Sequence, residues 1–159
     1  MNLESSLAER LRFLIRVVRK ECAHLTHTDR RLFAAPFSVE MAAELDRDAD
    51  LAERVEAFAS RYARLQDTLG DKLLPLVLRA LGEKPGAVID NLDRAERLGL
   101  LGSADHWMAM RRIRNQMIHE YIEDPEQLSS ALLAGHGFVP VLVATADALI
   151  GEAERRGWA

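Results

Sequence analysis

Residues 50–81 read DLAERVEAFASRYARLQDTLGDKLLPLVLRAL, and this stretch decides the fold. Apolar residues recur along it at the three- and four-residue spacing that places them on one side of an α-helix. Pro75 is expected to kink this helix, because proline removes one helical hydrogen bond, and Gly82 is expected to end it. The stretch therefore predicts the longest helix of the chain, with an apolar stripe made of Leu51, Val55, Phe58, Tyr62, Leu65 and Leu69.

The sequence before this stretch predicts a first helix over residues 3–24. A connection is expected over 25–37, where Thr26, Thr28, Asp29 and Pro36 interrupt the pattern. Ser38 is a plausible N-cap for a short helix over 39–48, because its hydroxyl suits the unpaired amides of a first turn. The stripe of the first helix consists of Leu7, Leu11, Leu14, Ile15 and Val18.

Three further helices are expected after residue 81. Lys84-Pro85-Gly86 predicts a turn before a helix over 87–98, and Ser103 is expected to cap a helix that runs to about Tyr121. Asp124-Pro125 opens the last helix, 126–156, which Gly135 and Gly137 are expected to bend. Val139 to Val143 alone would suit a strand, but a single strand would have no partner, so helix is the prediction.

Composition agrees with a helical domain. The chain has 159 residues, of which 48% are hydrophobic, and its formal net charge is −4. Short loops between long helices favour antiparallel neighbours. The prediction is one domain over 1–159, an all-α antiparallel up-and-down bundle with four to five main helices. A net negative charge gives no general attraction for nucleic acid, so any site for a polyanion must be local.

The sequence points to the cytoplasm. Cys22 is the only cysteine, which excludes an internal disulfide and fits a reducing compartment. The first residues lack the apolar core of a signal peptide. The longest apolar run, Phe138 to Ile150, includes Pro140 and Asp147 and is too short to cross a bilayer, so no membrane association is expected.

Two groups of residues resemble metal sites only in part. Cys22, His24 and His27 are close in sequence but have no further strong ligand set. Asp46, Asp48 and Asp50 alternate as in a calcium loop, but the glycine and the closing glutamate of such a loop are missing. The prediction is no metal and no cofactor.

Residues 111–121, RRIRNQMIHEY, are the strongest candidate for chemistry. On a helical wheel Arg114 falls inside an apolar arc, and Asn115 and His119, four residues apart, sit together on its flank. The guanidinium of arginine binds phosphate with two parallel hydrogen bonds, and histidine exchanges protons near neutral pH. The arc itself consists of Trp107, Met110, Ile113, Met117, Ile118 and Tyr121.

A purely structural interpretation stays open for these residues. Arg114 could extend along the stripe and pair with a carboxylate, and His119 could interact with the dipole at the helix end. The Arg-x4-His spacing also recurs at Arg19 and His24, where neither the following asparagine nor the later tyrosine is present. That second occurrence is interpreted as accidental.

The pattern Arg114-Asn115-x3-His119-x-Tyr121 resembles the Arg-x4-6-His motif of the HEPN superfamily in its HepT-like form. Arg112 also satisfies the longer spacing, but Arg114 matches better because Asn115 follows it. The resemblance extends upstream through Arg64-Leu65-Gln66-Asp67 and Gly70-Asp71-Lys72-Leu73-Leu74. It continues through Asn91-Leu92-x-x-Ala95-x-x-Leu98-Gly99-Leu100-Leu101 and Trp107, and spans about residues 50–130.

This resemblance implies a homodimer in which the arginine and histidine of both subunits face one cleft. It implies a ribonuclease that cuts RNA without metal, in which His119 moves protons and Arg114 stabilises the charged phosphorane. Asn115 would orient the pair or bind phosphate, and Asp67 would reach the same cleft and tune His119.

The resemblance also implies a partner. In HepT-like toxin–antitoxin pairs a minimal nucleotidyltransferase (MNT) antitoxin can add adenylyl groups to the motif tyrosine, here Tyr121. The alternative for Tyr121 is a core aromatic residue with a hydrated hydroxyl. Two functions follow: an RNA-cutting toxin, favoured by the complete motif, or a non-catalytic HEPN module that only binds a nucleotidyltransferase, favoured by the acidic net charge.

Overall fold

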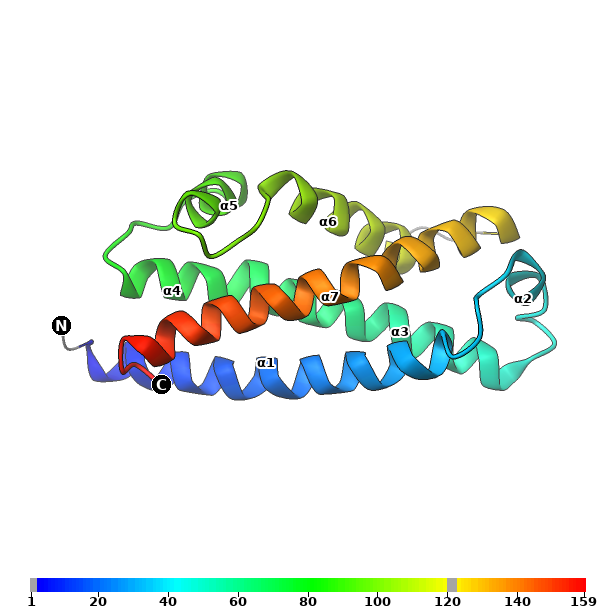
Figure 1. The fold of residues 1–159 in the computed structure, drawn as a ribbon, viewed down its shortest axis with the longest axis horizontal. Helices are drawn as coiled ribbons and strands as arrows, with labels where there is room; N and C mark the ends of the chain where they lie inside the picture. The colour runs from blue at the N-terminus through cyan, green and yellow to red at the C-terminus, as the bar shows by residue number, and fades with distance from the viewer. Residues whose placement is uncertain (1–2, 120–122) are drawn as a thin grey trace.

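The computed structural model describes residues 3–119 and 123–159, and no strand occurs among them. The chain forms an all-α helical bundle, as predicted. The start of α1 and the end of α7 lie at the same end of the molecule (Figure 1). The elements are α1 (Ser5–Leu32), α2 (Val39–Ala43), α3 (Ala49–Asp67), η1 (Thr68–Leu73), α4 (Leu74–Ala80), α5 (Val88–Arg97), α6 (Ala104–His119) and α7 (Pro125–Arg155).

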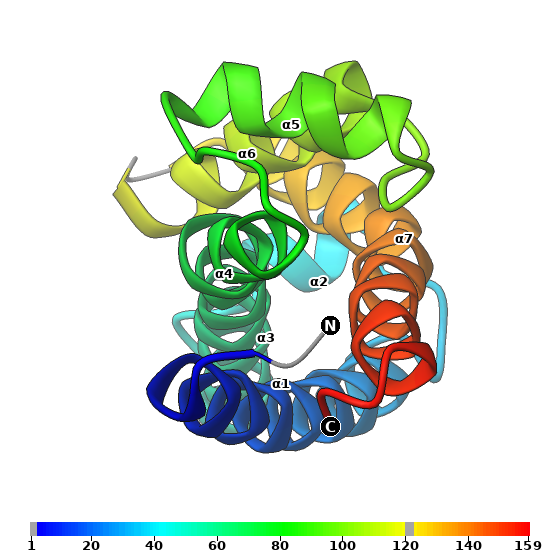
Figure 2. The ribbon, with the colours of Figure 1, turned by 90° about the vertical axis from the view of Figure 1, so that its left-hand side faces the viewer.

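The long helices run up and down beside one another. We call the continuous helical segment α3–η1–α4, residues 49–80, the rod; it runs antiparallel to α1, and α7 runs antiparallel to α6 (Figure 1). Seen from the end, α1 forms one side of the bundle, the rod and α7 stand on either side of the core, and α5 and α6 cover the fourth side (Figure 2). The predicted antiparallel arrangement is therefore present.

One hydrophobic cluster joins these helices. Its largest fully buried side chains include Phe58 and Tyr62 on α3 and Met110 on α6. Tyr62 lies in the predicted stripe, and its hydroxyl donates a hydrogen bond to the Met110 carbonyl at 3.1 Å. A buried hydroxyl needs such a partner, because an unpaired one would cost free energy.

The first helix is longer than predicted. The expected connection over 25–37 is wrong in its first part, because α1 continues to Leu32. Leu25, Thr28 and Leu32 are buried and extend the stripe, so burial outweighs the weak helix preference of threonine. Ser38 does cap α2, accepting a hydrogen bond from the Met41 amide at 3.1 Å, but α2 ends at Ala43 rather than near 48.

The middle of the rod is wound differently from the prediction. In place of a simple kink at Pro75, a π-helical turn, η1, precedes α4, whose first turn contains Pro75. Proline has no amide hydrogen to continue the α-helical pattern, and a wider turn on its N-terminal side accommodates that gap. Gly82, at a φ of 84°, ends the rod as predicted.

The last helix continues unbroken from Pro125 to Arg155, through Gly135, Gly137 and Pro140. The prediction of helix for Val139 to Val143 is confirmed. By length and composition α7 could cross a membrane, although 39% of its most apolar stretch is buried inside the bundle and core helices of soluble proteins pass the same test. The expectation of no membrane association stays a prediction.

Gly70 in η1 lies against the indole of Trp107 on α6. A Cβ at this position would lie 3.1 Å from Trp107 Cζ2 and 3.2 Å from its Nε1. Gly70→Ala is therefore expected to lower the free energy of unfolding by about 1–3 kcal/mol, the usual cost of overpacking a core, in chemical denaturation.

Gly137 is the matched control for this substitution. It lies in the interior of α7 with open space where a Cβ would go. Gly137→Ala is expected to raise the free energy of unfolding by about 0.5–1 kcal/mol, because glycine costs that much relative to alanine inside a helix. If the two substitutions had the same effect, close packing of Gly70 on Trp107 would be excluded.

Glu21 is a buried carboxylate on α1 that faces η1. Its two oxygens lie 2.9 and 3.1 Å from Thr68 Oγ1. Burial raises the pKa of Glu21, while the bond from Thr68 and the charges of Arg64 and Lys72 act in the opposite direction. Because the folded chain holds this proton more tightly than the unfolded chain, ionisation of Glu21 lowers stability above the raised pKa.

Glu21→Gln is therefore expected to unfold at a higher temperature than the parent at neutral pH. The advantage should shrink as the pH falls through the raised pKa, where the parent becomes protonated and its penalty disappears. Thermal melts across this pH range measure the difference. Glu9 is an exposed carboxylate on the same helix, so Glu9→Gln is the control. An equal rise in its unfolding temperature would mean that the lost net charge alone explains the effect of Glu21→Gln.

Candidate functional site

The candidate site lies where α6 crosses the rod. Ser103 caps α6, its Oγ accepting a hydrogen bond from the His106 amide at 3.1 Å, as predicted. Glu96 on α5 also accepts from the Ala104 amide at 2.7 Å, so two side chains satisfy the start of the helix. Farther along, Trp107 packs on Gly70 and the Met110 carbonyl accepts from Tyr62. These contacts fix which side of α6 faces the rod.

Arg114 forms a two-pronged ion pair with Asp67. Its Nε donates to Asp67 Oδ1 at 3.2 Å, and its Nη2 donates to Asp67 Oδ2 at 2.7 Å. Nη1 also lies 3.4 Å from Asn115 Oδ1. The Arg114 side chain is 17% exposed and that of Asp67 is 44% exposed, so the pair lies at the edge of the core with the carboxylate toward solvent.

The structure therefore brings together three of the predicted site residues, Arg114, Asn115 and Asp67. Asp67 contacts Arg114 directly, and its expected effect on His119 falls on a side chain outside the described residues. The structural interpretation of Arg114, pairing with a carboxylate, describes this contact as well.

The other two predicted residues are only partly described. His119 is the last residue of α6, and its side chain, like Tyr121, lies outside the described residues. One position in the predicted apolar arc differs: Trp107 and Met110 are buried, but Ile118 is 40% exposed. Ile118 is one turn beyond Arg114 on the same side of α6, and that side faces the solvent-facing Asp67 rather than the core.

The second Arg-x4-His occurrence has a different environment. Arg19 pairs with Glu154 on α7 at 3.4 Å, and His24 is exposed on α1.

Burial raises the pKa of the Cys22 thiol to about 11, so this cysteine is a poor nucleophile. Within residues 3–119 and 123–159, no three histidine, cysteine or acidic side chains gather as metal ligands would.

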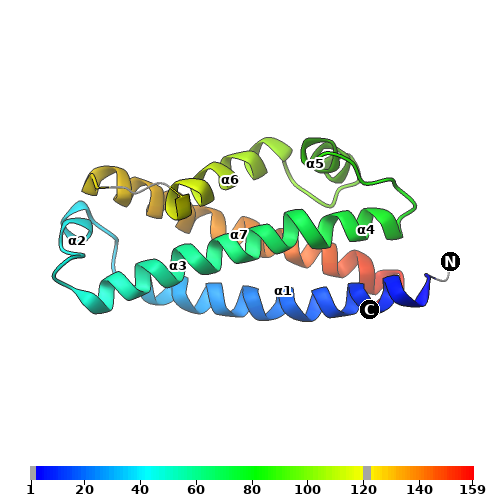
Figure 3. The same ribbon diagram turned by 180° about the vertical axis from the view of Figure 1, so that it is seen from behind.

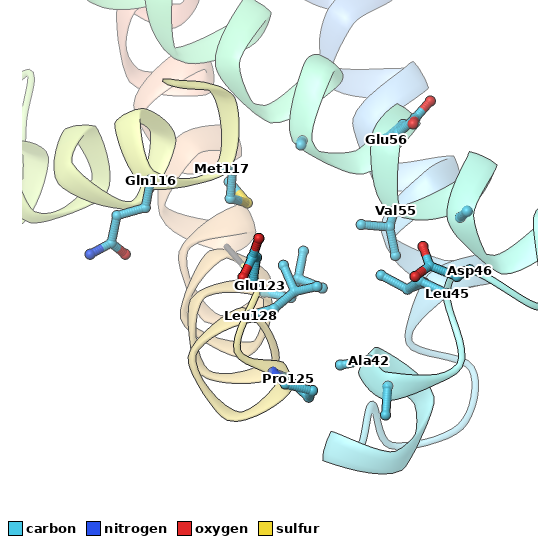
Figure 4. Close-up of a pocket in the computed structure, with 14 residues that line it drawn as sticks. Ala42, Leu45, Asp46, Val55, Glu56, Gln116, Met117, Glu123, Pro125 and Leu128 are labelled. Atoms are coloured by element: carbon cyan, nitrogen blue, oxygen red, sulfur yellow. The ribbon is translucent and has the colours of Figure 1, made fainter. Parts of the chain in front are cut away.

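A cavity of about 580 Å³ near α6 is separate from the ion pair. It opens between α2 and α3 on one wall and the end of α6 and start of α7 on the other (Figure 4). Met117, Val55 and Leu128 supply apolar lining, whereas Asp46, Glu56 and Glu123 supply carboxylates. This charge would repel phosphate, so the cavity is not where an RNA backbone would bind.

Comparison with protein-family models, with curated proteins and with solved structures finds no match to this chain. The HEPN resemblance therefore depends on its motif residues, and it stays a prediction.

Sequence reasoning missed the two contacts that place α6. No pattern indicated that the Tyr62 hydroxyl would bind a carbonyl on α6, because Tyr62 looks like any other member of an apolar stripe. Gly70 did carry a signal: a glycine inside a long predicted helix costs stability, so its presence indicates close approach of a neighbour.

The ion pair is expected to couple α3 to α6 energetically. Asp67→Asn should lower the free energy of unfolding by about 1–2 kcal/mol, less than the ~3–5 kcal/mol of a fully buried pair because Asp67 is partly solvated. A double-mutant cycle with Arg114→Gln should give a coupling energy of about 1 kcal/mol. Asp71→Asn, an exposed carboxylate on the same rod, is the control, and zero coupling between Asp67 and Arg114 would show that their contact adds nothing to stability.

Proposed function

We propose that this protein is a metal-independent endoribonuclease of the HEPN type, acting as the toxin of a HEPN/MNT toxin–antitoxin pair. The observation that carries the proposal is the Arg114–Asp67 ion pair at the motif, which holds a guanidinium in one orientation at the edge of the core. Preorganised charge of this kind stabilises a transition state without having to rearrange when the charge develops.

The proposed reaction uses the 2′-hydroxyl of RNA as the nucleophile. Its oxygen attacks the adjacent phosphorus and loses its proton to His119, and as the bond from phosphorus to the 5′-oxygen breaks, His119 returns that proton to the 5′-oxygen. The products are a 2′,3′-cyclic phosphate and a 5′-hydroxyl. Arg114 binds the extra negative charge of the phosphorane, and Asn115 orients the guanidinium or bonds to phosphate.

The proposal includes a homodimer in which Arg114 and His119 of both copies face one cleft. A single α6 offers few cations for a polyanion, so two copies would double the positive charge around the scissile phosphate. It also includes an MNT antitoxin that adds an adenylyl group to Tyr121, placing negative charge where the RNA phosphate would bind. These elements come from the family resemblance.

A second function, a non-catalytic HEPN module that partners a nucleotidyltransferase, is favoured by one observation. The cavity near the end of α6 is bordered by carboxylates, and the chain is net negative, so this region suits a basic protein surface better than RNA. Both functions use the same end of α6, and cleavage separates them.

Purified protein is expected to cut RNA in the presence of EDTA and to leave 2′,3′-cyclic phosphate ends. Arg114→Ala and His119→Ala should each lower the cleavage rate by at least about 10²-fold, since positioned proton transfer alone contributes ~10²–10⁴. Arg112→Ala, an exposed arginine two residues away that fits the longer motif spacing, is the matched control and should retain cleavage.

Gel analysis of end-labelled RNA and thermal melts of the same variants give the result. Loss of all cutting on chelation would exclude the metal-free mechanism. If the Arg114→Ala variant melts far below the parent and its refolded fraction cuts RNA normally, Arg114 has a structural role. A folded parent that never cuts RNA would favour the binding module.

A further inference from the structure

A line of basic side chains runs along the exposed side of α1 next to the rod. Lys20, His24, His27 and Arg31 follow one another at spacings of four, three and four residues, so they lie on one side of the helix, and all four are exposed. With a rise of about 1.5 Å per residue, Lys20 and Arg31 are separated by about 16 Å. Between these two positions, no acidic residue shares this side of the helix.

The rod adds two arginines beside this line. Arg61 on α3 reaches across to α1, where Nη1 donates to the His24 carbonyl at 3.2 Å and to the Thr28 hydroxyl. Arg64 is exposed one turn further along α3. Figure 3 shows α1, the rod and α6 side by side on this face of the molecule. We call Lys20, His24, His27, Arg31, Arg61 and Arg64 the basic row.

Four of the six members of the basic row are lysine or arginine, Lys20, Arg31, Arg61 and Arg64, and these carry its positive charge at pH 7. Across the part of the chain that the structure describes, none of the six forms a salt bridge with a carboxylate. Some cations outside the row do pair with carboxylates: Arg19 pairs with Glu154, and Arg155 and Arg156 both pair with Glu152. The row therefore concentrates available positive charge on a protein that is net negative.

The basic row lies in the same neighbourhood as the candidate site. Glu21 on α1 accepts a hydrogen bond from the Thr68 hydroxyl at 2.9 Å, and Thr68 directly follows Asp67 on the rod. Glu21 is one residue from Lys20 and three from His24. The Lys20 end of the row is thus level with Asp67, which holds Arg114, and Arg64 lies one turn before Asp67 on α3.

An exposed aromatic ring continues the line on α1. Phe13 is 52% exposed and lies seven residues, two helical turns, before Lys20. The guanidinium carbon of Arg16 is 5.9 Å from the centre of its ring. An exposed aromatic beside a line of cations is the combination that binds single-stranded nucleic acid, where bases stack on rings and phosphates lie on cations.

We propose that the basic row and Phe13 form a binding surface for a single strand of RNA that leads toward Arg114. A groove of about 570 Å³ between α1 and α3, lined in part by His27, Arg31 and Arg61, lies along this path. Asp50 and Glu53 line the α3 side of that groove, so binding is strongest toward Lys20 and Arg64. Only the choice of RNA over DNA depends on the proposed nuclease function.

Fluorescence anisotropy with a labelled 2′-O-methyl oligoribonucleotide tests the surface. The methyl group blocks attack by the 2′-oxygen, so binding is measured whether or not the protein cuts RNA. The double variant Arg31→Gln/Arg64→Gln should raise Kd by roughly tenfold or more at low salt. The slope of log K against log salt should also fall by about 1.4, because each lost phosphate contact removes ~0.7 for a single strand.

The matched control is Arg12→Gln/Arg30→Gln. Both arginines are exposed on α1, and Arg30 is adjacent to Arg31, but both lie on a different side of the helix and outside the basic row. Phe13→Ala should raise Kd between about fivefold and a hundredfold with an unchanged salt slope, the signature of lost stacking. Leu133→Ala, an exposed apolar residue on α7, is its control.

The proposal is overturned if the two arginine double variants weaken RNA binding equally, or if the parent shows no salt-sensitive binding. Displacement of the probe by polyglutamate, by duplex RNA or by anionic vesicles as readily as by single-stranded RNA would also overturn it, in favour of a different partner. Binding that requires the row in a protein that never cuts RNA would contradict the nuclease proposal and leave the surface intact. RNA cleavage and binding that are unaffected by substitutions in the row would support the nuclease proposal and contradict the binding surface.

Discussion

The fit of α6 against the rod is the constraint on which the rest of the candidate site depends. Trp107 can lie on η1 only because Gly70 has no side chain, and Tyr62 can bond to the Met110 carbonyl only because the two helices are then close. Arg114, one turn beyond Met110, is brought to Asp67 by the same alignment. Backbone packing at one end of α6 thus determines the orientation of a guanidinium at the other end.

The π-helical turn contributes to this alignment. Asp67 is the last residue of α3 and Thr68 the first of η1, so the change in winding begins immediately after the carboxylate. Asp67 therefore faces α6 while Thr68 faces Glu21 on α1 and Gly70 faces Trp107. π-Helical turns within α-helices are often found at functional sites, because they redirect side chains without breaking the helix.

Charge is distributed unevenly over the bundle. The carboxylates Asp46, Glu56 and Glu123 border the cavity between α2, α3 and α7, whereas the cations of the basic row lie on the α1–rod face. A net charge of −4 conceals this separation, because it averages over both regions. Attraction of a polyanion depends on the local charge within a Debye length, about 8–10 Å at physiological salt, rather than on the total.

Helical periodicity was enough to predict the fold class, the rod and most of its buried stripe. It failed at residues 25–32, where threonine and aspartate looked like a loop but Leu25 and Leu32 kept the burial pattern of α1. It also could not show that Asp67 contacts Arg114, because the two are separated by 47 positions and meet only through tertiary packing. Motif spacing identifies residues on one helix, and a partner from another helix leaves no mark in that spacing.

The cavity beside α2 has a consequence for motion. At Gly135 α7 packs closely on α3, since a Cβ there would lie 3.2 Å from Phe58 Cε1, and α6 contributes Met117 Cε at 3.5 Å. Beyond this crossing the helices separate around about 580 Å³ of unfilled space. Because the free energy of local opening follows local packing, the last turns of α6 open at lower cost than the Trp107 end. Amide hydrogens in the turn that carries Gln116 and Met117, which line this cavity, are therefore expected to exchange with solvent sooner than those beside Trp107.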